Sequence, residues 1–256
     1  MRPICKRPLS VRGREIGGSR PLVCLPLVAV DLASLLDQAR STVIRNPDLL
    51  EWRIDGFAPA GEIEPILAAL ASLRQTIGEI PLILTCRSVQ EGGIQAVPLE
   101  DRIKLLESML QTGLADIVDF EISNGEAAVS RIVQSTRANQ AKLILSYHDF
   151  QRTPEPGFMI EMLTEAQRLG ADIAKLAVMP QDYQDVLDLL GATLKARNEV
   201  LAIPAITIAM GEIGRLTRIA GALFGSDISF ALDQQSSAPG QIPVDELRQA
   251  WKILAL

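Results

Sequence analysis

The stretch Glu51-Trp52-Arg53-Ile54-Asp55 alternates charged and apolar side chains. Successive side chains of a β-strand point to opposite faces, so the three charges share one face and Trp52 and Ile54 share the other. We expect the apolar pair to pack against helices, which leaves the charges pointing into the centre of the fold. Buried ions are costly unless they are paired or used. The stretch therefore predicts a functional site or, for one of the three charges, a structural ion pair.

Short apolar runs of this kind alternate with longer amphipathic stretches eight times along the chain. The predicted strands are 22–30, 49–55, 81–87, 116–122, 142–148, 172–178, 202–210 and 227–232. The predicted helices are 32–45, 63–77, 99–112, 125–139, 155–169, 181–198, 214–223 and 244–254. Eight such units indicate an α/β protein with a single (β/α)8 TIM barrel over residues 21–256. We interpret residues 1–20 as an N-terminal extension, forming a hairpin that closes the bottom of the barrel. The competing architecture is an open doubly wound sheet, but no G-x-G-x-x-G motif follows the first predicted strand.

The composition excludes several classes of protein. Of 256 residues, 48% are hydrophobic and 22% are charged, which excludes disordered and fibrous chains. The net charge of −6 opposes binding to nucleic acid or to an acidic membrane. No apolar run approaches the roughly 18 residues that span a bilayer, and no secretory signal is recognisable. Cys5, Cys24 and Cys86 share no C-x-x-C spacing, so we expect reduced thiols and a cytoplasmic location.

A lysine and several acids are predicted to face the centre of the barrel together. Asp119 and Glu121 have the inward parity of the fourth strand, and Lys175 is the only one of six lysines that lies inside an apolar strand. Burial favours the neutral, nucleophilic form of an amine, which suits attack on a ketone. The alternative is a structural lysine that balances the inward acids.

The single histidine, His148, ends the fifth strand, next in order to the strand of Lys175. One imidazole excludes a zinc or iron site built on several histidines, whereas carboxylate-bound Mg²⁺ is not excluded by ligand type. One imidazole suffices to move a proton, with Glu91 as an orienting carboxylate. A lone histidine is ordinarily structural; the position beside Lys175 favours the functional interpretation.

Further polar residues fall at strand ends, where barrel enzymes carry their sites. Arg87 ends the third strand and could clamp an oxygen-rich ligand, although a solvated loop arginine fits the same pattern. Arg218 lies one turn into the helix after strand seven, where backbone amides could receive an anion. The segment Ser236-Ser-Ala-Pro-Gly-Gln241 resembles a mobile lid, but an ordinary surface loop has the same composition.

Six motifs taken in order resemble type I 3-dehydroquinate dehydratases. They are E-W-R-I-D, T-C-R-S-x-x-E-G-G, H-D-F, A-K-L-A-V-M-P, T-R-I-A-G and S-A-P-G-Q, between Glu51 and Gln241. The resemblance implies syn elimination of water from 3-dehydroquinate, giving 3-dehydroshikimate in the shikimate pathway. The reaction would pass through an imine, without a metal or a cofactor. It also implies that the protein forms a homodimer and that its binding partner is a small molecule, the substrate 3-dehydroquinate.

The resemblance assigns roles to ten residues. Lys175 would form the Schiff base, His148 would remove the C2 proton and return a proton to the departing C1 hydroxyl, and Glu91 would hold His148. The substrate-binding set would comprise Glu51, Arg53, Arg87, Met210, Arg218, Ser237 and Gln241. In this set Arg218 would pair with the substrate carboxylate.

Four positions depart from the family pattern, and two other functions remain open. Pro26, Tyr147, Ile208 and Glu212 stand where serine, asparagine, methionine and lysine are common. One alternative is a Schiff-base aldolase for a sugar phosphate, which the absence of an evident phosphate site disfavours. The other is a non-enzymatic ligand-binding relative, which the presence of Lys175 and His148 disfavours.

Overall fold

The computed structural model describes residues 2–58, 62–233 and 236–256 and confirms the TIM barrel. Eight parallel strands pair in the order β10-β3-β4-β5-β6-β7-β8-β9. They are β3 (Leu22–Leu27), β4 (Leu49–Arg53), β5 (Leu82–Thr85), β6 (Ile117–Glu121), β7 (Lys142–Asp149), β8 (Ile173–Val178), β9 (Ala205–Ala209) and β10 (Ile228–Phe230). The backbone N–H of Asp227 donates to the carbonyl of Ala205 over 2.7 Å, so the sheet nearly closes between β9 and β10.

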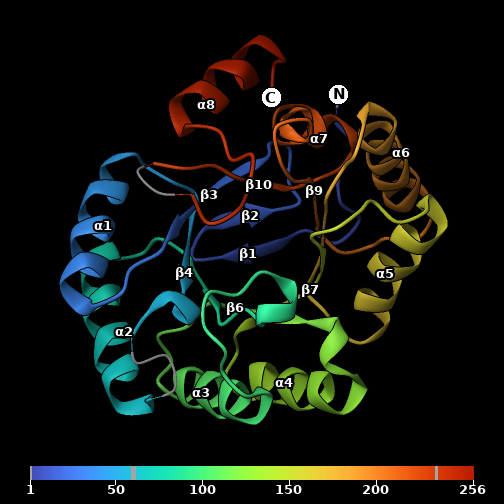
Figure 1. Cartoon of the computed structure of the whole chain (residues 1–256). Helices are drawn as coiled ribbons and strands as arrows, with labels where there is room; N and C mark the ends of the chain where they lie inside the picture. The colour runs from blue at the N-terminus through green and yellow to red at the C-terminus, as the bar shows by residue number, and fades with distance from the viewer. Residues whose placement is uncertain (1, 59–61, 234–235) are drawn as a thin grey trace.

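Helices surround the strands in a ring, as Figure 1 shows. They are α1 (Leu32–Ile44), α2 (Ile63–Ile77), α3 (Leu99–Gln111), α4 (Glu126–Ala138), α5 (Pro156–Arg168), α6 (Tyr183–Glu199), α7 (Arg215–Phe224) and α8 (Val244–Ile253). Short 3-10 turns follow three strands: η1 (Ile54–Gly56), η2 (Val89–Glu91) and η3 (Ile122–Asn124). None of the helices in the described ranges is long and apolar enough to cross a lipid bilayer.

The alternating strand pattern divides the apolar residues into two cores. Trp52 and Phe120 belong to the outer core between strands and helices, as does Cys86. The inner core fills the barrel itself with Leu22, Cys24, Leu49, Ile83, Ile117, Ile144, Ile173, Ala177, Ile206, Ile208, Met210, Ile228 and Phe230. Most of these inner residues lie near the starts of the strands, so the apolar filling leaves the opposite end free for polar side chains.

A short antiparallel hairpin precedes the barrel. It consists of β1 (Leu9–Val11) and β2 (Arg14–Ile16), and in Figure 1 it lies across the middle of the ring. Its turn residues Arg12 and Gly13 have φ of 44° and 76°, the positive values that a tight hairpin turn of this kind requires. Val11 and Ile16 pack against the inner core, and Ile16 is fully buried.

Candidate active site

A cavity, with about 470 Å³ of empty space that includes its open mouth, lies at the carboxyl ends of the strands. All ten residues singled out from the sequence line it: Glu51, Arg53, Arg87, Glu91, His148, Lys175, Met210, Arg218, Ser237 and Gln241. The others are Gly92, Phe150, Ala177, Ile208, Phe230 and Ala238. Residues from across the chain therefore meet in one cavity.

Lys175 points into this cavity from the middle of β8. Its Nζ lies 2.7 Å from Oδ2 of Asp119 and 4.0 Å from Oε1 of Glu51. The ring of Phe230 covers the ammonium, with its centroid 4.6 Å from Nζ. Burial alone was the basis for the predicted nucleophilic amine, and the structure adds the ion pair with Asp119 to its surroundings.

His148 and Glu91 form a hydrogen-bonded pair beside the lysine. In the pairing of β7 with β8, Ser146 lies opposite Lys175 and His148 lies opposite Ala177. Oε2 of Glu91 is 2.9 Å from Nδ1 of His148 and accepts the backbone N–H of the same residue over 2.9 Å. When Glu91 is ionised its carboxylate can only accept, so Nδ1 of His148 then carries the hydrogen and Nε2 is the basic nitrogen.

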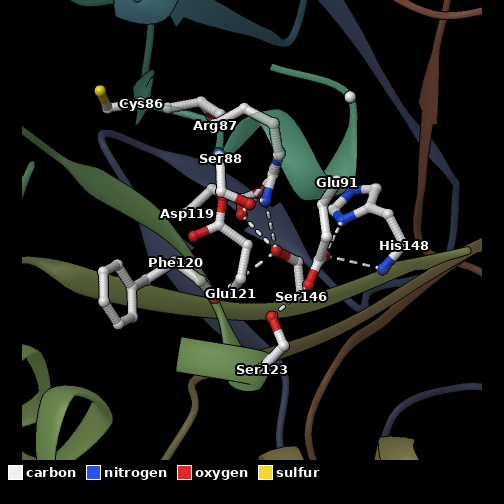
Figure 2. A network of polar contacts seen from close by, with 12 residues as sticks. Cys86, Arg87, Ser88, Glu91, Asp119, Phe120, Glu121, Ser123, Ser146 and His148 are labelled. Carbon is white, nitrogen blue, oxygen red and sulfur yellow. Dashed lines mark hydrogen bonds and ion pairs between the residues drawn. The ribbon is translucent and has the colours of Figure 1, made fainter. Parts of the chain in front are cut away.

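The protonation of this pair follows from its burial. Desolvation raises the pKa of Glu91 to about 7. Desolvation, together with the positive charges of Arg87 and Lys175, lowers the pKa of His148 well below its ordinary value. At neutral pH the imidazole is therefore uncharged and able to accept a proton. The hydroxyl of Ser123 in η3 donates to Oε1 of Glu91 and helps to hold the carboxylate (Figure 2).

Arg87 is buried at the centre of the polar network in Figure 2, so the alternative of a solvated loop arginine is wrong. Its guanidinium contacts Oδ1 of Asp119 at 2.8 Å and Oε1 of Glu121 at 3.1 Å, and it donates to the hydroxyl of Ser146 over 2.8 Å. These carboxylates raise the pKa of Arg87 despite its burial. The side chain is thus a fixed cation in the wall of the cavity.

The strand predicted over residues 49–55 is too long, and Asp55 lies outside it. The strand β4 ends at Arg53, so the alternation does not continue to Asp55, which lies in η1. Its carboxylate binds the Arg53 guanidinium at 3.0 and 2.8 Å and accepts the backbone N–H of Arg87 and Ile94. Asp55 is therefore the structural ion-pair partner, while Glu51 and Arg53 line the cavity.

Arg218 differs from the other buried arginines. Arg2, Arg53, Arg74, Arg87, Arg102 and Arg197 each contact a carboxylate. Among the described residues Arg218 has no such partner: its guanidinium donates to the carbonyls of Phe230 and Pro239, each at 3.0 Å, and its Nε has no partner. Burial lowers its pKa to about 10. A desolvated cation without an anion at a cavity wall is suited to binding an anionic ligand group.

The segment from Ser236 to Gln241 packs over the cavity. The carbonyl of Ser237 accepts a hydrogen bond from Arg53 over 3.2 Å, and Gln241 binds both the backbone and the hydroxyl of Ser237. Gly240 has φ of 75°, and a Cβ there would lie 2.1 Å from the carbonyl oxygen of Gly211. This close approach requires glycine and brings the segment against the end of β9.

Several residues that shape the site were not among the ten. Asp119 was expected to point inward, but its contact with Lys175 depends on the register between strands, which the sequence does not show. Phe230 has the inward parity of β10, a signal that could have identified it. Ser123 follows a strand end without any motif. No group of three or more His, Cys, Asp or Glu within 2–58, 62–233 and 236–256 is arranged to hold a metal ion.

Of the four departures from the family pattern, only Ile208 lines the cavity. Tyr147 has outward parity and packs against Phe158 of α5, with ring centroids 5.6 Å apart. Pro26 is buried in β3, opposite Glu51 in the strand register, and Glu212 is exposed. The departures therefore leave the lysine, the histidine and their hydrogen-bond partners in place.

Fold and site together are typical of barrel enzymes that form imines with carbonyl substrates, in which a buried lysine lies beside an acid–base group. The model of the type I 3-dehydroquinase family matches residues 23–256. The chain is 42% identical to the 3-dehydroquinate dehydratase of Geobacillus thermodenitrificans over 253 residues, covering 98% of this chain and 97% of that protein. The corresponding enzyme of Geobacillus kaustophilus is 44% identical over the same length, with the same coverage.

Solved structures agree with these relatives. The crystal structure of 3-dehydroquinate dehydratase from Geobacillus kaustophilus has a TM-score of 0.96 at 42% identity, covering 98% of this chain and 97% of that one. The type I enzyme from Clostridium difficile, solved with covalently modified comenic acid, has a TM-score of 0.93 at 35% identity, covering 97% of each chain.

The chain belongs to the type I 3-dehydroquinase family. It is a hydro-lyase of the shikimate pathway that dehydrates 3-dehydroquinate to 3-dehydroshikimate. This membership rejects the sugar-phosphate aldolase and the non-enzymatic relative as interpretations.

Proposed function

We propose that Lys175 is the amine that condenses with the ketone of 3-dehydroquinate, and that His148 is the acid and base of the elimination. The carbonyl oxygen leaves as water and a protonated imine forms at C3. Nε2 of His148 then takes the C2 proton, and the electron pair of that C–H bond moves toward the iminium. Return of the proton from His148 to the C1 hydroxyl releases water, and hydrolysis of the imine frees the product and the lysine.

The placement of two groups in one cavity is the observation that carries this proposal. Lys175 and His148 lie on neighbouring strands with the same inward parity and line the same space. Glu91 supports the role of His148, because its carboxylate selects the tautomer with a basic Nε2.

Borohydride reduction tests this assignment directly. We expect the enzyme incubated with 3-dehydroquinate and borohydride to gain the mass of one reduced ligand, and peptide mapping to place it on Lys175. The exposed Lys195 and Lys252 serve as internal controls and are expected to remain unmodified. An adduct on another lysine, or no adduct under turnover conditions, would contradict the role of Lys175.

The substrate is proposed to bind with its carboxylate on Arg218. The missing anionic partner of this buried guanidinium supports the assignment. Ser237 and Gln241 would close over the carboxylate side. Glu51, Arg53 and Arg87 would bind ring hydroxyls or hold one another in place, and Met210 would line the ring.

The variant Arg218→Lys tests the carboxylate site. Lysine keeps the charge but loses the planar fork that binds a carboxylate through two parallel hydrogen bonds. We expect KM for 3-dehydroquinate to rise roughly tenfold, with a smaller change in kcat. Arg215→Lys, at an exposed position on the same helix, is the matched control and should leave KM unchanged. Equal KM values in wild type and Arg218→Lys would rule out the assignment, provided that both proteins melt at similar temperatures.

The domain division, the cellular location, the oligomeric state and the absence of macromolecular partners are also proposals. We assign residues 1–20 to an extension whose hairpin closes the barrel bottom and residues 21–256 to the catalytic barrel; the burial of Ile16 among inner-core residues supports this division. Three buried free cysteines and the net charge of −6 support a cytoplasmic location. Family membership supports a homodimer, which light scattering can test. We expect no nucleic-acid or membrane partner.

A further inference from the structure

We infer that Asp119 is a catalytic counter-ion: it accepts a hydrogen bond from Lys175 before the reaction and from the protonated imine during it. This inference rests on the proposed role of Lys175. It assigns a function to a buried carboxylate that the imine mechanism above does not use.

The geometry around Nζ singles out this carboxylate. Asp119 is on β6 and is nearly inaccessible to solvent, with Oδ2 2.7 Å from Nζ. Glu51 is the other nearby carboxylate, but it lies 4.0 Å away and accepts a hydrogen bond from Thr85 over 2.8 Å. Asp119 is therefore the acceptor that a hydrogen on Nζ reaches.

Two further contacts fix the carboxylate in this position. Oδ1 of Asp119 lies 2.8 Å from the Arg87 guanidinium and accepts the Ser146 hydroxyl over 2.6 Å (Figure 2). Arg87 and Lys175 lower the pKa of Asp119 despite the cost of burial. The group is therefore ionised at neutral pH, so it serves as a fixed negative charge and not as a proton acceptor.

The atom balance of imine formation explains why a fixed charge suits this step. A lysine ammonium carries three hydrogens. One passes to His148 so that the free amine can attack the ketone, a second leaves the nitrogen when the imine forms, and both end on the departing carbonyl oxygen as water; one hydrogen remains on the iminium nitrogen. The ammonium and the iminium therefore carry the same charge at the same atom. Asp119 can remain paired with this nitrogen throughout, and no reorganisation of the site is needed.

The negative charge of Asp119 also affects how strongly the imine withdraws electrons from the substrate. Only a protonated imine withdraws electrons strongly from the C2–H bond, and a nearby carboxylate favours the protonated form. Replacing Asp119 with a neutral group would let the iminium lose its proton at lower pH. Several other titratable and charged groups surround Nζ. Asp119 and Glu51 contact it, the charge of Lys175 influences the pKa of Cys24 and of His148, and Arg53, Arg87, Glu91 and Arg218 line the same cavity.

The variant Asp119→Asn keeps the shape and removes the charge. We expect kcat at neutral pH to fall about 10- to 100-fold, the range for hydrogen bonds to charged groups. We also expect the alkaline limb of the kcat profile to move to lower pH, because the iminium loses its proton more easily. In the conservative variant Asp119→Glu, which keeps the negative charge, the alkaline limb should lie closer to its wild-type pH than in Asp119→Asn. An alkaline limb that does not move in Asp119→Asn would contradict the inference.

The matched control is Glu121→Gln. Glu121 contacts Arg87 from the same strand as Asp119, yet it makes no contact with Lys175. This variant therefore disturbs the arginine network without removing the counter-ion. Its alkaline limb should stay at the wild-type position, and an equal shift in both variants would mean that Asp119 acts only through Arg87.

A second measurement uses the wild-type enzyme and does not depend on whether a variant folds. Cyanoborohydride reduces a protonated imine and spares the neutral one, whereas borohydride reduces both. With 3-dehydroquinate at mildly alkaline pH, we expect both reagents to label Lys175. Labelling by borohydride alone would refute the counter-ion while leaving the imine intact. Labelling by neither reagent would refute the imine itself.

Discussion

A Lys175→Met enzyme is expected to lose at least about 10⁴-fold in kcat, because the covalent route through the imine disappears with the amine. Methionine has nearly the length of the lysine stem and fits among Phe230 and the inner core. Asp119 retains Arg87 as its cation, and Glu51, which loses its ion pair with Lys175, retains the hydrogen bond from Thr85. The fold should therefore survive the change. The loss would come from the chemistry, since a simple ketone acidifies the C2 proton much less than an iminium does.

Formation of the enone product, followed by its ultraviolet absorbance, measures this loss. Calorimetric titration with substrate should still show binding, because the carboxylate site that we propose at Arg218 is untouched. Lys195→Met, at an exposed position of α6, is the control and should keep full activity. A Lys175→Met rate within tenfold of wild type would refute the imine mechanism.

A His148→Ala enzyme is expected to lose about 10²- to 10⁴-fold in kcat, the usual contribution of a positioned acid–base group. Lys175 remains, so the imine should still form but neither eliminate nor hydrolyse at the normal rate. Borohydride should then trap a larger fraction of the protein as the adduct than in wild type. Normal turnover, or failure to trap any adduct, would argue against this division of roles.

The pH profile gives the His148 prediction a second readout. Glu91, whose pKa burial raises to about 7, gains its charge as the pH rises through neutrality, and only the ionised form holds the Nδ1–H tautomer of His148. The pKa of His148 itself is lowered, so the imidazole remains neutral over this interval. Wild-type kcat should therefore rise with pH to a plateau above about 7. In His148→Ala this acid limb should be lost, because Glu91 has no imidazole left to orient.

The sequence pattern predicted the barrel because eight strands and eight helices each carry their own periodicity, and α2 was predicted with its observed bounds. Strand ends were less predictable, since they depend on where the neighbouring strand stops pairing. The alternation around Trp52 suggested that the strand continued to Asp55, whereas the chain turns into η1 after Arg53. That turn makes Asp55 a structural partner of Arg53 instead of a cavity residue.

The contacts between side chains of different strands were the least predictable part of the site. Parity places Asp119 and Lys175 inside the barrel, but their contact depends on two intervening registers, β6 with β7 and β7 with β8. The burial of Arg87 depends likewise on carboxylates 32 and 34 positions further along the chain, at Asp119 and Glu121. Local sequence does not show such partners. The ten site residues could therefore be predicted, but the hydrogen bonds and ion pairs between them could not.

The closure of the barrel bottom that we propose for the hairpin would restrict how small molecules enter and leave the barrel. Val11 and Ile16 pack against the apolar residues that fill the barrel near the starts of the strands. With that end closed, substrate would arrive, and both water and product would depart, through the cavity at the carboxyl ends of the strands, beside the segment around Gly240. Each departure has to precede the next arrival, so we expect the reaction product to compete with substrate for a single point of entry.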